Sequence, residues 1–222
     1  MKKIIYACCI ILLGGTLKAQ QPHPVRPTVT DESQTILKKI QQQWTGLNSA
    51  KITFTLQSEK NGKSGTRMQG TLWTQGKSYR LSIPGQTIFC DGKEVWNYLP
   101  ENNEVSVSPY EEDGNDISIN PIQVIATYEK YYRSAFIRET SEKGIAVQII
   151  DLYPKQGQSF YKIRMVIRKD KLLPLRASIH EKDGTVDTYH FDQILKNPKT
   201  APGFFTFHPE NYPDVEIIDM RE

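Results

Sequence analysis

The spacing of hydrophobic residues in the first part of the chain predicts a helix. After residue 30 the apolar positions recur every three or four residues, at Ile36, Leu37, Ile40, Trp44 and Leu47. This spacing places them on one face of a helix. Thr30 or Asp31 can accept hydrogen bonds from its first free amides. The sequence therefore predicts an amphipathic helix whose apolar face needs a partner.

From Ala50 onward the apolar period becomes two, which is typical of strands with one buried face. Ile52, Phe54 and Leu56 alternate with threonine and glutamine. Similar runs, separated by Asn-Gly, Asp-Gly and related turn signals, predict further strands. These lie at 66–74, 78–83, 87–90, 93–99, 104–108, 135–140, 145–153, 159–168, 173–181 and 185–194.

A second helix is predicted where Asn120 can cap and Pro121 can occupy the first helical position. Its apolar positions are Ile122, Ile125, Tyr128 and Tyr132. A last apolar element, 204–207, precedes an acidic tail.

Two helices cannot supply the crossovers of a parallel sheet with ten or eleven strands. The sequence therefore predicts an α+β fold, mainly antiparallel β, in which the helices cover the sheet. No repeat of fixed period is present, and residues 31–222 are expected to form a single domain.

The N-terminal residues indicate export. Lys2 and Lys3 precede an apolar run too short to span a bilayer, and a small residue, Ala19, follows. Residues 1–19 are predicted to be a signal peptide, and 20–30, with three prolines, an extended leader.

Charge and cysteine content narrow the classes of partner. Removal of residues 1–19 takes three of the 28 basic residues and none of the 25 acids, which leaves a formally neutral protein. This balance argues against nucleic-acid binding. Of three cysteines, only Cys90 lies beyond the signal peptide, so no intramolecular disulfide is expected.

The sequence carries no recognisable motif for catalysis or metal binding. The four histidines have no metal-ligand spacing, and residues 62–65 are one residue short of a nucleophile elbow. Cys90 ends an apolar strand and is interpreted as a buried structural residue. We expect neither an enzyme, a metal site nor a cofactor.

The strands carry an unusual number of aromatic residues, which leaves two interpretations open. Aromatic residues favour strands and fill cores. Alternatively, a strongly curved, unclosed sheet holds a space too large for its own side chains, and the helices form a movable cover.

The order of several short motifs resembles one known family. They are residues 70–73 (Gly-Thr-Leu-Trp), 91–93 (Asp-Gly-Lys), 96–98 (Trp-Asn-Tyr), 120–121 (Asn-Pro) and 205–209 (Phe-Thr-Phe-His-Pro). Together they resemble the periplasmic outer-membrane lipoprotein carrier family, LolA, over about Ser33 to Arg221. The resemblance implies a half-barrel whose lid helices close a hydrophobic cavity, in a soluble periplasmic monomer.

The resemblance also implies a function and a site. Its carriers take acylated lipoproteins from an inner-membrane ABC-type releasing complex and pass them to an outer-membrane acceptor. We expect Ile125 and Tyr128 on the lid. The residues expected to line the acyl-chain cavity are Phe54, Leu56, Leu72, Tyr79, Leu81, Trp96, Tyr98, Ile163 and Met165, with weaker face assignments for Trp96 and Tyr98.

One departure affects the expected gating. Family carriers often have an arginine followed by proline after the Leu-Trp strand, and this arginine latches the lid. Residues 74–77 read Thr-Gln-Gly-Lys here. The latch is therefore either remade elsewhere or absent. A periplasmic lipid-binding or lipid-sensing protein on the same fold remains an alternative, as does a secreted hydrolase.

Overall fold

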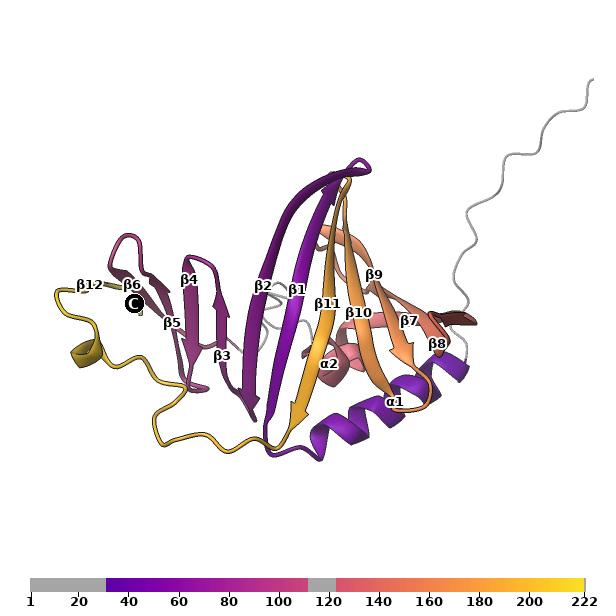
Figure 1. The fold of residues 1–222 in the computed structure, drawn as a ribbon, viewed down its shortest axis with the longest axis horizontal. Coiled ribbons are helices and arrows are strands. Elements are labelled where there is room, and N and C mark those ends of the chain that lie inside the picture. Colours follow the sequence, from indigo (N-terminus) through magenta and orange to yellow (C-terminus); the bar gives the residue numbers. More distant parts are fainter. Residues whose placement is uncertain (1–30, 112–122, 222) are drawn as a thin grey trace, which may run out of the picture.

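The computed structural model describes residues 31–111 and 123–221. The predicted signal peptide, leader and Asn120–Pro121 helix start lie outside them. The described residues form one curved twelve-stranded sheet and two α-helices (Figure 1). The helices are α1 (Asp31–Thr45) and α2 (Gln123–Tyr131). The strands are β1 (Ala50–Lys60), β2 (Lys63–Gln75), β3 (Ser78–Ile83), β4 (Gln86–Cys90), β5 (Glu94–Leu99), β6 (Glu104–Pro109), β7 (Tyr132–Glu142), β8 (Ile145–Pro154), β9 (Phe160–Arg168), β10 (Leu173–Glu181), β11 (Thr185–Lys196) and β12 (Glu216–Asp219).

The sheet consists of two antiparallel meanders joined side by side. Strands β1 to β6 form one meander and β7 to β11 the other, and β1 pairs with β11. Strand β12 adds to β6 in parallel, so β12 and β7 are the two ends of the strand order. The predicted unclosed, mainly antiparallel sheet is confirmed. It has one strand more than expected, because β12 lies in the acidic tail to which no element was assigned.

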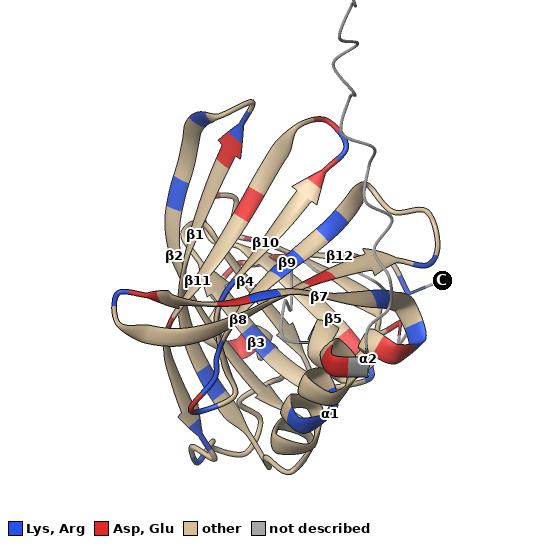
Figure 2. Cartoon of the chain, turned by 90° about the vertical axis from the view of Figure 1, so that its right-hand side faces the viewer, with Lys and Arg blue, Asp and Glu red and all other residues tan. Residues whose placement is uncertain are grey.

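Both helices cover one face of the sheet, on its concave side (Figure 2). They pack against each other and against β7. The predicted apolar face of α1 is confirmed, since Leu37 and Ile40 have no exposed surface. Ile125 and Tyr128 of α2 are buried in the same core.

Apolar residues that are neighbours across the strands form a continuous row on the inner face of the sheet. Ile52 pairs with Leu72, Leu72 with Leu81, and Leu81 with Ile88. Phe54 lies opposite Gly70, where the Cβ of any larger residue would overlap the Phe54 ring. Glycine at this position therefore leaves room for an aromatic side chain in the core.

The outer face is covered in part by the segment that follows β11. Residues 204–207 form turns rather than a strand, and the Phe204 ring meets the Trp73 ring at 5.0 Å. The Arg80 guanidinium lies between two rings, 4.5 Å from the Phe89 centroid and 5.1 Å from the Phe204 centroid. Aromatic and cation–π contacts thus hold this segment on the convex side.

A buried charge cluster lies on the outer face of the other meander. Asp151 on β8 is only 2% exposed and accepts two hydrogen bonds from Arg164, at 2.7 and 2.8 Å. Lys162 Nζ lies 3.8 Å from the same carboxylate. Burial and the nearby cations lower the pKa of His180 on β10. The bidentate pair compensates the cost of burying the Asp151 charge.

Candidate functional site

Nine of the eleven predicted site residues meet in one core between the sheet and the helices. Seven come from the sheet and two from α2, although they are spread over more than 100 positions of the chain. All but Leu56, which is partly buried, are buried. They are Phe54, Leu56, Leu72, Tyr79, Leu81, Ile125, Tyr128, Ile163 and Met165.

The placement of Trp96 and Tyr98 on this face was wrong. Cross-strand partners share a face of the sheet. Val95 pairs with Cys90, which belongs to the concave core, so Trp96 points to the other face. There Trp96 packs with Phe89 in a second cluster, against which Tyr98 also packs. Strand alternation predicts two faces but does not say which of them the helices cover.

A pocket of about 490 Å³ opens at one end of the covered face. It lies between the C-terminal end of α1, the side of α2 and the adjacent ends of β1, β2 and β3. Its volume is within the range of small-ligand sites. Of the predicted cavity residues, Tyr79 lines this pocket. Its larger apolar and aromatic lining residues are Trp44, Leu47, Tyr79, Tyr110 and Tyr131.

Side-chain hydrogen bonds hold α1 against its neighbours, and none was anticipated from the sequence. The hydroxyls of Ser33 on α1 and Ser134 on β7 lie 2.9 Å apart and are buried. Gln41 Nε2 donates to the carbonyl oxygen of Ala126 on α2 at 2.8 Å. The Tyr128 hydroxyl donates to the Glu129 carboxylate at 3.0 Å and lies 3.5 Å from the carbonyl oxygen of Gln34. These contacts connect α1 to β7 and α2.

The residues at the expected latch position have a different environment. Thr74, Gly76 and Lys77 line the 490 Å³ pocket. Residues 74–77 therefore lie at the pocket. They do not take part in the hydrogen bonds that Ser33 and Gln41 of α1 form with β7 and α2. Serine and glutamine are common on helix surfaces. The sequence alone therefore does not indicate that Ser33 and Gln41 form hydrogen bonds with β7 and α2.

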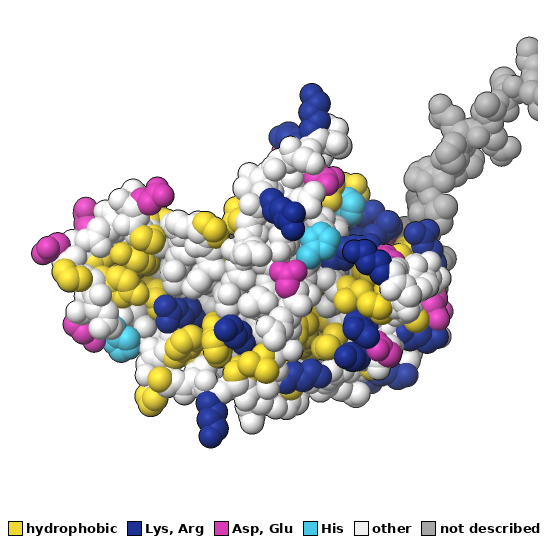
Figure 3. Space-filling view, in the orientation of Figure 1, with side chains coloured by type: hydrophobic (Ala, Val, Ile, Leu, Met, Phe, Trp, Pro, Cys, Tyr) yellow, Lys and Arg dark blue, Asp and Glu magenta, His cyan; other side chains and the backbone are white. Residues whose placement is uncertain are grey.

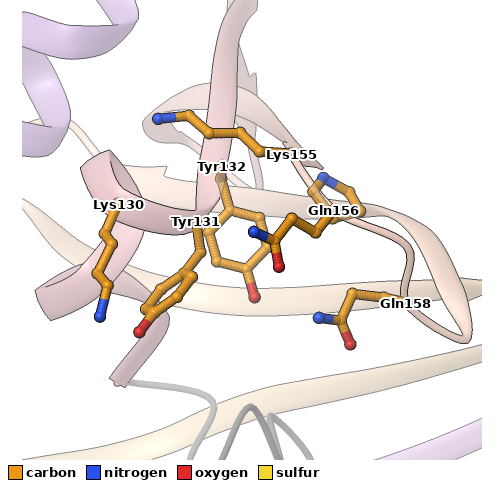
Figure 4. Close-up of a pocket in the computed structure, with 7 residues that line it drawn as sticks. Lys130, Tyr131, Tyr132, Lys155, Gln156 and Gln158 are labelled. Carbon is orange, nitrogen blue, oxygen red and sulfur yellow. The ribbon is translucent and has the colours of Figure 1, made fainter. Parts of the chain in front are cut away.

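The C-terminal end of α2 is attached to the sheet by a direct chain connection and by a hydrogen bond. Helix α2 leads into β7 without a loop, and Lys155 Nζ donates to the carbonyl oxygen of Glu129 at 2.6 Å. A second pocket, about 150 Å³, lies beside this junction, and the Tyr132 ring lies next to Gln156 in it (Figure 4). Burial raises the pKa of Tyr132 to about 12.

Cys90 has the structural environment expected for it. It has no exposed surface, and burial raises the pKa of its thiol. Its sulfur accepts the Gly92 amide at 3.4 Å and donates to the Lys77 carbonyl oxygen at 3.7 Å. A protonated, enclosed thiol is a poor nucleophile. The prediction of a buried cysteine is confirmed.

An open antiparallel sheet with helices over its concave apolar face defines a fold of the lipoprotein-carrier and lipid-binding class. The chain belongs to the family described as outer membrane lipoprotein carrier protein LolA, whose sequence model matches residues 45–208. An outer-membrane lipoprotein carrier protein from Methylobacillus flagellatus is 27% identical over 136 residues. That match covers 61% of this chain and 61% of the relative's length.

One solved structure shares the fold at lower identity, and a second is similar with a lower score. An uncharacterized conserved protein from Thermus thermophilus is 15% identical with a TM-score of 0.57, covering 85% of this chain and 99% of that one. A LolA superfamily protein from Nitrosomonas europaea is 13% identical with a TM-score of 0.44, covering 79% and 97%. Among the described residues, no helix has the length and hydropathy required to cross a bilayer.

Proposed function

We propose that this protein is a soluble periplasmic carrier that binds the acyl chains of lipoproteins on its concave face and moves them from the inner to the outer membrane. It acts by binding alone, without catalysis, as a monomer. The observation that carries the proposal is the apolar face beneath α1 and α2, which family membership supports.

The helices make reversible binding physically reasonable. Each buried methylene contributes about 0.8 kcal/mol, so a chain of roughly 15 methylenes gains ~12 kcal/mol by leaving water. A pocket of about 490 Å³ is already open beside Trp44 and Leu47. Displacement of α1 would extend it over the core row that includes Leu72. When cargo leaves, the apolar faces of the helices cover that row again, which lowers the barrier to release.

The proposed partners follow from the same role. An ATP-driven complex in the inner membrane would load the carrier, and an acceptor at the outer membrane would receive the cargo. The family description supports this assignment.

A lipid-binding or lipid-sensing protein on the same fold is the second candidate. The size of the pocket favours it, because about 490 Å³ suits one small ligand without any movement of the helices.

Native mass spectrometry of protein purified from the periplasm separates the two candidates. Co-purified acylated protein supports the carrier, and free lipid supports the second candidate. A diacylated lipopeptide and the same peptide without acyl groups then test binding directly. If neither the lipopeptide nor any lipid binds, both candidates are wrong.

A reversible lock tests whether α1 must move. The Ser33 and Ser134 oxygens lie 2.9 Å apart, so cysteines at both positions are close enough for a disulfide. The oxidised double variant should bind the lipopeptide at least tenfold more weakly than the same protein after reduction. Each single variant is the control and should not respond to reductant. Equal binding before and after reduction would show that α1 stays in place.

A further inference from the structure

Strand β12 leaves one edge of the sheet open within the described residues. It pairs with β6 on one side only and is the last strand in the order. The Glu216 amide donates to Asn103 and the Met220 amide to Val107, so the alternating backbone groups of Ile217 and Asp219 point away from β6. Such an edge is a template for another strand.

Three apolar side chains on this edge are poorly covered. All four residues of β12 are exposed. Ile217 is 50% exposed and Met220 is 53% exposed, while Ile218 is 39% exposed. Exposed apolar residues on an edge strand are a liability, because proteins usually protect such strands with lysine, proline or a bulge. The exposure is better explained by a strand that docks there.

The charge around the edge restricts what can dock. Residues 100–109 and 210–221 together carry six carboxylates and only one basic residue, Arg221. Arg221 is already paired with Asp219 and Glu94. Figure 3 shows acidic and hydrophobic side chains together at this end of the molecule, and more lysines and arginines toward the other end.

Two of these carboxylates lie at paired positions. Glu216 of β12 is the register partner of Glu104 of β6. Like charges on neighbouring strands repel each other, so this arrangement weakens the pairing of β12 unless a cation lies between them.

We propose that the free edge of β12 binds an extended segment of a partner protein in which basic and apolar side chains alternate. Its backbone completes the sheet, its basic side chains meet Glu216, which lies beside Glu104, on one face, and its apolar side chains cover Ile217 on the other. A second copy of this strand fits poorly, since antiparallel self-pairing brings Glu216 toward Asp219. An anionic membrane surface is repelled by the same acids.

The test uses a fluorescein-labelled peptide of alternating lysine and valine, with a matched peptide carrying glutamate in place of lysine. Fluorescence anisotropy should show binding of the basic peptide at least about tenfold tighter, with affinity falling as salt rises. A proline-interrupted basic peptide should bind at least fivefold more weakly, because it cannot pair along the edge.

Variants of the chain locate the site. Ile217→Pro removes an outward amide that β6 does not use, and Glu216→Lys reverses one charge; each should weaken binding by about fivefold or more. Glu181→Lys, at the end of β10, is the matched charge control and should bind as the unaltered chain does. Thermal unfolding followed by circular dichroism verifies that each variant is folded.

Several outcomes would overturn the proposal. Equal binding of the basic and acidic peptides would remove the charge argument, and no binding of either would remove the site. Unchanged binding by folded Glu216→Lys would place the peptide elsewhere. If sedimentation shows a dimer that Glu216→Lys dissociates, the occupant is a second copy.

Discussion

Substitution of Ser33 by alanine tests the hydrogen bond that holds α1 on the sheet. The Ser33 and Ser134 hydroxyls lie 2.9 Å apart, and Ser134 is only 4% exposed. In Ser33→Ala the Ser134 hydroxyl loses this partner while it remains buried. A buried polar group left without its partner costs about 1–3 kcal/mol. The free energy of unfolding should therefore fall by about 1.5 kcal/mol in a urea titration.

The same substitution should tighten cargo binding. The cost of leaving the Ser134 hydroxyl without a partner applies only to the closed state, in which α1 lies on the sheet. Once α1 moves away, water can reach Ser134 and hydrogen-bond to it. A loss of about 1.4 kcal/mol in the closed state changes the opening equilibrium roughly tenfold. When the closed state predominates, the apparent affinity for a diacylated lipopeptide rises by the same factor. Isothermal titration calorimetry of both proteins measures this change.

A second hydroxyl pair provides the control. Ser178 and Thr188 lie 3.0 Å apart on β10 and β11, away from the helices. Ser178→Ala should lose stability without any change in lipopeptide affinity. The reasoning is refuted if Ser33→Ala loses the expected stability but binds cargo with the same affinity as Ser178→Ala. A double-mutant cycle with Ser134→Ala should give a coupling energy of about 0.5–1.5 kcal/mol.

Three further predictions concern the sheet itself. Gly70→Ala forces the Phe54 ring to move and should lower the unfolding free energy by about 1–3 kcal/mol; an unchanged urea midpoint would contradict this. Arg164→Met leaves the buried Asp151 carboxylate without its bidentate partner and should cost about 3–5 kcal/mol at pH 7, with part recovered in a double variant that also carries Asp151→Leu. The folded-state pKa of His180 is lowered, so protons bind the unfolded chain preferentially and stability should fall as the pH drops below about 6.5. His180→Gln should show a flatter dependence between about pH 7 and 5, and equal slopes would argue against this role.

Local spacing predicted most of the secondary structure. The three- and four-residue spacing of Leu37 and Ile40 identified the buried face of α1, and the alternation from Ile52 to Leu56 identified β1. These predictions succeed because the backbone period alone determines which side chains share a face. The end of α2 was less accurate, since Tyr132 already belongs to β7.

Long-range pairing decided what local spacing could not. Trp96 and Tyr98 alternate as expected, but the pairing of Val95 with Cys90 turns them to the outer face. Strand β12 has only four residues, and its strand conformation depends on β6, about 110 positions earlier. Isolated short strands are unstable without a neighbour, so no local pattern could have indicated it.

The amino-acid sequence by itself determined the antiparallel architecture, the two amphipathic helices and most of the apolar residues that the helices cover. Only the tertiary structure decided which sheet face they cover, where the pocket opens and how α1 is held. Ser33 and Ser134 show the reason, because they are 101 positions apart and become partners only when the chain folds. Periodicity is a property of neighbouring residues, whereas contacts between a helix and the sheet, a pocket and an open edge arise from segments that meet in space.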